Sequence, residues 1–205
     1  FSAVKSSSAQ IVETDSGACG WGEAHAARAP TAIAELVNTT LADLVTGLDA
    51  EDIDGVWARV YRMQLASHGA GAAAVIGLSG IDLALWDLKA RGVGLPLWRL
   101  LGGRPRAIPA YAGGISLGFQ APDALAEEAA GFVARGYRAL KLRLGDGVAN
   151  DRARVAAVRA RLGDEVEILV DANTAYTLAD VEAMAPVLEA CRVGWLEEPF
   201  PAHAW

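Results

Sequence analysis

Cysteine and histidine are both scarce in this chain. The two cysteines, Cys19 and Cys191, are far apart in the sequence, which disfavours a disulfide framework and favours two free thiols in a reducing compartment. The three histidines, His25, His68 and His203, are scattered without the spacing of zinc ligands. Thiol and imidazole chemistry therefore offers no candidate metal site in this sequence.

Long apolar runs and an excess of basic residues are also missing. No run approaches the about 20 apolar residues that a membrane-spanning helix needs, and the N-terminus has no basic start followed by an apolar stretch. Lys and Arg number 18 against 25 Asp and Glu, so the net charge is −7 and no basic stripe is available. We expect a cytoplasmic protein whose partners include neither nucleic acid nor a membrane.

The ends of the chain are unusual for a domain. The sequence has no initiator Met, opens on a strand-like stretch at Phe1–Val4, and stops at Trp205 shortly after the last predicted strand. A domain seldom ends in this way. We therefore expect the 205 residues to be part of a longer protein.

The first half of the chain has the pattern of a small α+β domain. Polar and apolar residues alternate over residues 9–24 on both sides of the turn Asp15-Ser16-Gly17, which predicts a β-hairpin. Apolar residues then recur at helical spacing over 30–48, 50–65 and 72–90, which predicts three helices. With 53% hydrophobic residues the chain can bury a sizeable core.

From residue 108 onward, strand-like and helix-like segments alternate. The predicted strands are 108–113, 138–144, 167–171 and 193–197, and the predicted helices between them are 122–135, 150–162 and 178–191. The strands begin 26 to 30 residues apart, which is typical of βα units in a parallel α/β sheet. Both half of an eight-stranded barrel and a small doubly wound sheet fit this pattern. The barrel is favoured because no glycine-rich phosphate loop follows the first strand.

Polar side chains recur in one phase at the ends of these strands. Lys141 and Arg143 lie two residues apart, as do Asp171 and Asn173, and Glu197 ends the last strand. Side chains two apart share a face of the strand, and the C-terminal strand ends of a barrel form the active-site mouth. Each residue alone has a plainer explanation, since a strand-end Asp often caps a turn and a Lys often lies on the rim. Their recurrence on consecutive strands favours a shared site.

Carboxylates from neighbouring strands suit Mg²⁺, which prefers hard oxygen ligands and retains water that a substrate can displace. A proton next to a carboxylate is too weakly acidic for a side chain to remove unaided, so the enediolate must be stabilised. A divalent cation bound to the carboxylate oxygens does this. A lysine near a cation can have its pKa lowered toward neutrality and act as the base.

Several segments resemble one known family. The run Gly77–Ala90, with its continuation at 94–103, resembles the helix that joins the capping domain to the barrel in the mandelate racemase and muconate lactonizing enzyme family of the enolase superfamily. The hairpin ending at 20–24 resembles two strands of that capping domain. The resemblance implies a partial α+β capping domain over residues 1–104 and the first half of a modified TIM (β/α) barrel over 105–205.

The same resemblance implies roles for the strand-end residues. Asp171 would be the first metal ligand and Glu197 the second, while Asn173 would lie beside the substrate. The third acidic ligand and the acid or base on the opposite face would belong to strands that come after Trp205. The family often has Lys-x-Lys where this chain has Lys141-Leu142-Arg143, and an arginine, with a pKa above about 12, is a poor base. Arg143 would then hold the substrate carboxylate or stabilise the enediolate, leaving base duty to Lys141 or to a residue beyond the chain.

These residues lead to a functional hypothesis. We expect a Mg²⁺-dependent enzyme that removes the proton next to a carboxylate of a small-molecule carboxylic acid. Dehydration of a hydroxy or sugar acid is favoured, because a racemase needs a competent group on each face of its substrate. A racemase, epimerase or cycloisomerase is the nearest alternative, and a non-catalytic acid-binding relative is another. The resemblance also implies a homo-oligomer, and we expect residues 1–205 alone to be inactive because their metal shell would be incomplete.

Overall fold

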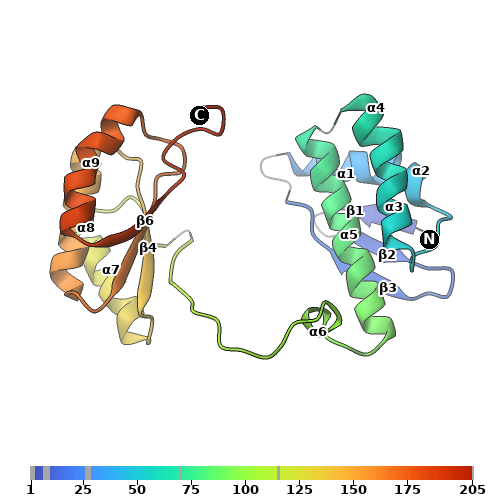
Figure 1. Cartoon of the computed structure of the whole chain (residues 1–205), viewed down its shortest axis with the longest axis horizontal. Helices are drawn as coiled ribbons and strands as arrows, with labels where there is room; N and C mark the ends of the chain where they lie inside the picture. The colour runs from blue at the N-terminus through green and yellow to red at the C-terminus, as the bar shows by residue number, and fades with distance from the viewer. Residues whose placement is uncertain (1–2, 7–9, 26–28, 70, 115, 205) are drawn as a thin grey trace. The chain divides into compact units, whose positions relative to one another are not determined.

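The computed structural model describes residues 3–6, 10–25, 29–69, 71–114 and 116–204 (Figure 1). The chain divides into two compact units, Phe1–Arg106 and Ala107–Trp205, and each has a hydrophobic core of its own. Two residues of the strand predicted at the start, Phe1 and Ser2, lie outside the described residues. None of the helices in the described ranges combines the length and the apolar character that crossing a bilayer requires.

The first unit contains a three-stranded antiparallel sheet of order β1-β2-β3 and a set of helices. Its elements are β1 (Ala3–Ser6), β2 (Gln10–Glu13), β3 (Cys19–Gly22), α1 (Pro30–Leu36), η1 (Val37–Leu41), α2 (Ala42–Val45), α3 (Ile53–Val60), η2 (Tyr61–Leu65), α4 (Ala66–His68), α5 (Ala72–Gly92) and α6 (Leu97–Leu100). The predicted hairpin corresponds to β2 and β3, which turn through Gly17 at a φ of 83°. The π-helical turn η1 interrupts the helix predicted over 30–48, η2 forms the last turn of the helix predicted over 50–65, and α6 was not predicted.

Glycines in β3 bring the sheet close to the long helix α5. A Cβ atom at Gly20 would lie 2.0 Å from the carbonyl oxygen of Ala84, and one at Gly22 would lie 2.0 Å from that of Gly80. Both obstacles are backbone atoms of α5, which cannot move aside as the end of a side chain can. Only glycine at these two positions therefore allows the sheet and the helix to pack at this distance.

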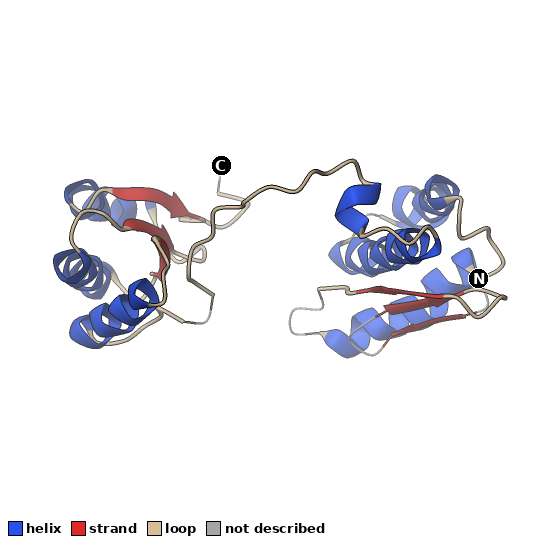
Figure 2. Cartoon of the chain, turned by 90° about the horizontal axis from the view of Figure 1, so that it is seen from below, coloured by secondary structure: helices blue, strands red, loops and turns tan. Residues whose placement is uncertain are grey.

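The second unit is a parallel α/β layer. Its elements are α7 (Pro122–Ala134), β4 (Ala139–Arg143), α8 (Val148–Leu162), β5 (Glu167–Asp171), α9 (Leu178–Ala190) and β6 (Val193–Glu197). The strands lie in the order β4-β5-β6, and α7, α8 and α9 cover one face of the sheet (Figures 1 and 2). A capping box between Thr177 and Asp180 begins α9.

The predicted strand at 108–113 is wrong as a full strand. In the described residues it is reduced to a single parallel bridge between Ala112 and Leu140. The Ala112 amide donates to the Ala139 carbonyl at 3.0 Å, and the Lys141 amide donates to the Ala112 carbonyl at 2.7 Å. Pro109 has no amide hydrogen to extend this ladder, and Ile108 is exposed. Apolar character alone therefore overstated the length of this strand.

Candidate active site

The face of β4 that turns away from the helices carries the two predicted cationic residues. Leu140 and Leu142 are fully buried, whereas Lys141 and Arg143 are half-buried on the opposite face. This alternation follows from the pleat of a strand, in which successive side chains point to opposite faces.

The strand register then brings the carboxyl ends of the three strands to one level. Arg143 pairs with Asp171 across β4 and β5, and Asp171 pairs with Glu197 across β5 and β6. Lys141 lies one step below Arg143 on the same face, so its long side chain can reach upward to the acids.

Both acids converge on the amino group of Lys141. Lys141 Nζ donates to Asp171 Oδ2 at 3.0 Å and to Glu197 Oε1 at 2.9 Å. The side chains of Lys141 and Asp171 are 14% and 11% exposed, and that of Glu197 is 37% exposed. Two carboxylates from neighbouring strands thus face one cationic atom, in a place largely shielded from water.

The charge state of Lys141 follows from this arrangement. Burial lowers the pKa of Lys141, but the hydrogen bonds to Glu197 and Asp171 and the attraction of both carboxylates outweigh burial, so the pKa is raised. From the sequence we expected a nearby cation to lower this pKa. In this structure the neighbours of Lys141 are anions, and they hold its proton in place.

Arg143 and Asn173 form a second pair at the same strand ends. Arg143 Nη1 donates to Asn173 Oδ1, and Arg143 Nη2 donates to the Gly114 carbonyl at 2.9 Å. The Asn173 amide in turn donates to Asp171 Oδ1 at 2.9 Å. Since a guanidinium has five N–H donors, Arg143 keeps donors for a bound anion after making these contacts.

Two aromatic side chains flank the acid pair. Lys141 Nζ lies 5.7 Å from the centre of the Tyr111 ring, and Tyr111 packs edge to face against Trp195 with ring centres 6.0 Å apart. Neither aromatic residue was predicted from the sequence. Trp195 lies two residues before Glu197 in a predicted strand, and this spacing was the available indication that it shares a face with the acid.

A buried polar cluster in the second unit was also missed. Asp151 and Arg154 are both buried on α8, together with Val155 and Val158, and Tyr176 is buried in the loop after β5. Residues 151, 154, 155 and 158 lie on one stripe of a helix. Charged residues on an otherwise apolar stripe were the feature of the sequence that could have revealed the cluster.

The acid pair has the donor chemistry of a Mg²⁺ site, although this chain offers only part of one. Asp171 and Glu197 are hard oxygen donors that already share one cationic partner. Within the described residues, no group of three His, Cys, Asp or Glu side chains comes together as a metal cluster. The residues present therefore fit two protein ligands of a Mg²⁺ ion, which commonly keeps water in its remaining positions.

Comparison with known proteins places both units in one family. Residues 3–102 match the family described as "Mandelate racemase / muconate lactonizing enzyme, N-terminal domain", and residues 124–205 match "Enolase C-terminal domain-like". The chain is 37% identical over 191 residues to 3,6-anhydro-alpha-L-galactonate cycloisomerase of Streptomyces coelicolor, covering 92% of this chain and 52% of that protein. It is 33% identical over 190 residues to arabinonate dehydratase of Saccharolobus solfataricus, covering 92% and 51%. The chain spans about half the length of the curated relatives it matches.

Solved structures agree with these matches. A member of the enolase superfamily from Polaromonas sp. JS666 superposes with a TM-score of 0.92 at 54% identity, covering 96% of this chain and 52% of that one. A racemase from Streptomyces coelicolor with bound magnesium superposes with a TM-score of 0.83 at 36% identity, covering 94% and 58%. The chain therefore belongs to the enolase superfamily, in the mandelate racemase and muconate lactonizing enzyme family, with an N-terminal capping domain followed by part of a TIM barrel.

Proposed function

We propose that the protein is a Mg²⁺-dependent enzyme that removes the proton next to the carboxylate of a small hydroxy or sugar acid and then eliminates water. The observation that carries this proposal is the convergence of Asp171 and Glu197, from adjacent strands, on one cationic atom. The name of one relative, arabinonate dehydratase, supports the loss of water, and the description of another, a racemase with bound magnesium, supports the metal.

Each side chain of the site has a role in this proposal. Asp171 and Glu197 would hold Mg²⁺, which supplies the positive charge that stabilises an enediolate. Arg143 binds the substrate carboxylate through the N–H groups that it does not use on Asn173 and Gly114. Asn173 accepts a hydrogen bond from Arg143 and so orients it, and it would contact the substrate beside Arg143.

Lys141 is the group of this chain that we assign to the substrate proton. Its amino group is bound to both acids and holds its proton tightly there. Lys141 can act as a base only when another cation binds the two carboxylates, because they then no longer raise the pKa of Lys141. Its role therefore depends on the same pair of acids.

The test uses Asp171→Asn and Glu197→Gln in the full-length protein, with Mg²⁺ affinity measured by calorimetry and water loss measured by formation of a 2-keto acid. Each substitution keeps the size of the side chain and removes a charge, and each should weaken Mg²⁺ binding by on the order of 10-fold or more and abolish water loss. Glu127→Gln is the matched control, because Glu127 pairs with Arg161 on the surface at 2.7 Å and lies on α7, away from the strand ends that carry the acids. Normal Mg²⁺ binding by either site variant would refute the proposal.

An isomerase is the second candidate function, favoured by the 37% identity to a cycloisomerase. Both reactions begin by removing the same proton, so they differ only in the later fate of the enediolate. A panel of hydroxy, sugar and anhydro-sugar acids in D₂O separates them. Exchange of the α-proton without water loss indicates a racemase or epimerase, an isomeric product from an anhydro acid indicates a cycloisomerase, and a 2-keto acid formed by loss of water indicates a dehydratase. An absence of both exchange and turnover across the panel would favour an acid-binding role without catalysis.

A further inference from the structure

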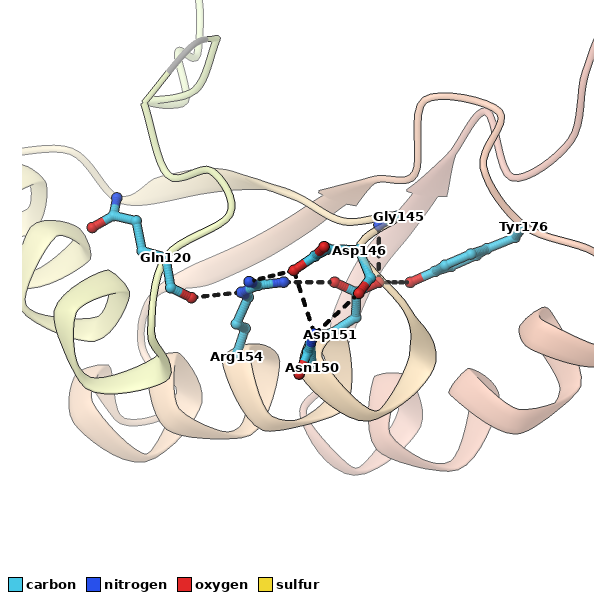
Figure 3. Close-up of polar contacts among 7 residues, drawn as sticks. All are labelled: Gln120, Gly145, Asp146, Asn150, Asp151, Arg154 and Tyr176. Atoms are coloured by element: carbon cyan, nitrogen blue, oxygen red, sulfur yellow. Dashed lines mark hydrogen bonds and ion pairs between the residues drawn. The ribbon is translucent and has the colours of Figure 1, made fainter.

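The buried cluster on α8 is built around one carboxylate. Asp151 is fully buried, and its two oxygens accept from three donors: Tyr176 Oη at 2.8 Å, the Gly145 amide at 2.9 Å and Arg154 Nη1 at 3.2 Å (Figure 3). A buried charge is costly unless it is paired and hydrogen-bonded. These donors satisfy Asp151 and join α8 to the loops that come after β4 and β5.

Arg154 extends the cluster to a third loop. Its guanidinium lies between the Asp151 carboxylate and the main-chain carbonyl of Gln120, to which Nε donates at 2.7 Å (Figure 3). Nη2 donates to Asp146 Oδ2 at 2.7 Å. The loops before α7, after β4 and after β5 are therefore all anchored to one buried ion pair.

Tyr176 connects this cluster to the acid pair. Its hydroxyl donates to Asp151, while its backbone amide donates to the Pro199 carbonyl at 3.0 Å. Burial raises the pKa of Tyr176, and the hydrogen bond to Asp151 raises it further, so the hydroxyl stays protonated and remains a donor. One residue thus bridges from α8 to the loop that follows Glu197.

The loop between β5 and Tyr176 needs such an anchor. Asn173 and Thr174 have φ angles of 44° and 64° in the left-handed region. Asn tolerates this backbone, but it is unfavourable for a β-branched residue such as Thr174. The Thr174 amide donates to the Glu198 carbonyl at 2.7 Å, and the Ala172 amide donates to the Glu197 carbonyl at 3.0 Å. Backbone hydrogen bonds therefore join the loop after Asp171 to the loop after Glu197. Of the residues that make these bonds, Tyr176 also binds α8, through its hydroxyl.

We propose that Tyr176 is a positioning residue for the acid pair: its hydroxyl, held by buried Asp151, fixes the loops after β5 and β6 and so sets the spacing of Asp171 and Glu197 for a divalent cation. The inference rests on the proposed function for the nature of that cation. The loop anchoring itself depends only on the contacts described above.

The experiment compares Tyr176→Phe with Arg159→Lys in the full-length protein. Tyr176→Phe removes only the hydroxyl. Arg159 binds the carbonyls of Cys191 and Val166 at 2.8 Å each, just before β6 and β5, so Arg159→Lys disturbs the opposite ends of the same strands. Asp151→Asn, which replaces one acceptor oxygen by a donor nitrogen, should act in the same direction as Tyr176→Phe.

Two measurements decide the outcome. Tyr176→Phe should speed hydrogen–deuterium exchange in peptides that cover 172–177 and 197–200, and should weaken Mg²⁺ binding by about 10-fold, as loss of an outer-shell partner does. Arg159→Lys should leave both unchanged. Unchanged exchange in these loops, equal effects of the two variants, or wild-type Mg²⁺ affinity in Tyr176→Phe would each overturn the inference. If the unmodified protein binds no Mg²⁺, the proposed function fails, while the exchange comparison still decides whether Tyr176 anchors the loops.

Discussion

Replacing Lys141 by methionine removes the cation that Asp171 and Glu197 share and keeps a side chain of similar length. Hydrogen bonds to charged groups contribute about 1.5–3 kcal/mol each when they are shielded from water. The bond to Asp171 joins side chains that are 14% and 11% exposed, so it should keep most of this value. The bond to Glu197, which is 37% exposed, is weakened by solvent screening. We expect Lys141→Met to lower the free energy of unfolding of the Mg²⁺-free protein by about 2–3 kcal/mol.

The assay is urea-induced unfolding followed by circular dichroism, in the presence of EDTA or of Mg²⁺. Lys89→Met is the matched control, because Lys89 pairs with Glu51 at 3.8 Å with side chains 34% and 71% exposed, and such surface pairs contribute about 1 kcal/mol or less. Mg²⁺ should stabilise Lys141→Met more than the unmodified protein, because the acids no longer share their charge with an ammonium group.

The pH dependence gives the prediction a second check. The folded pKa of Lys141 is raised above the unfolded value of about 10.4. Its contribution is therefore fully present below that pH and is lost only as the pH rises through the higher folded pKa. The stability gap between the unmodified protein and Lys141→Met should stay constant from neutral pH to about pH 9. The reasoning would be refuted if Lys141→Met and Lys89→Met lowered the free energy of unfolding equally. It would also be refuted if Mg²⁺ stabilised Lys141→Met no more than the unmodified protein.

Three further substitutions test the packing and the helix capping inside the two units. Gly22→Ala should lower the free energy of unfolding by about 1–3 kcal/mol, because the new Cβ would meet a carbonyl oxygen of α5; Gly131→Ala, inside α7 with open space around it, should instead raise it by about 0.4–1 kcal/mol in the same urea assay. Thr177→Ala should destabilise α9 by about 1 kcal/mol at neutral pH. The Thr177 hydroxyl and backbone amide donate to the Asp180 carboxylate and lower its pKa. The part of the stabilisation that comes from the hydroxyl is therefore present above the unfolded pKa of about 3.9 and is lost as the pH falls through the lower folded pKa. The difference in the free energy of unfolding between Thr177→Ala and the unmodified protein should therefore be smaller at about pH 3 than at about pH 7. The same difference at both pH values would contradict the proposed role of the Thr177 hydroxyl.

Local sequence patterns were most informative where a strand alternates cleanly. The strands predicted at 167–171 and 193–197 have the same bounds in the structure, and β4 was predicted with one extra residue at each end. Leu140 and Leu142 alternate with Lys141 and Arg143, and this pattern alone predicts which side chains leave the core. The strand-end carboxylates themselves predicted Mg²⁺, and the family resemblance added a specific role for each of them.

Local patterns gave the wrong structure at two kinds of place in the chain. The strand predicted at 108–113 has the composition of a strand but pairs only through Ala112. The two π-helical turns leave no mark in the apolar spacing that predicted continuous helices. The backbone pairing of Ala112 depends on Leu140, which is distant in sequence. A π-helical turn instead changes hydrogen bonds between residues close in the chain, and apolar spacing does not distinguish it from an α-helix.

The sequence by itself determined the family, the order of the elements and the face of the sheet on which Lys141, Asp171 and Glu197 lie, because these depend on side-chain periodicity and on residues close together in the chain. Only the tertiary structure decided that Lys141 is the shared counter-ion of the two acids, and that Asp151 anchors their loops through Tyr176. Those contacts join residues 25 to 56 positions apart, so they exist only once strand register and helix packing have placed the side chains within about 3 Å of one another.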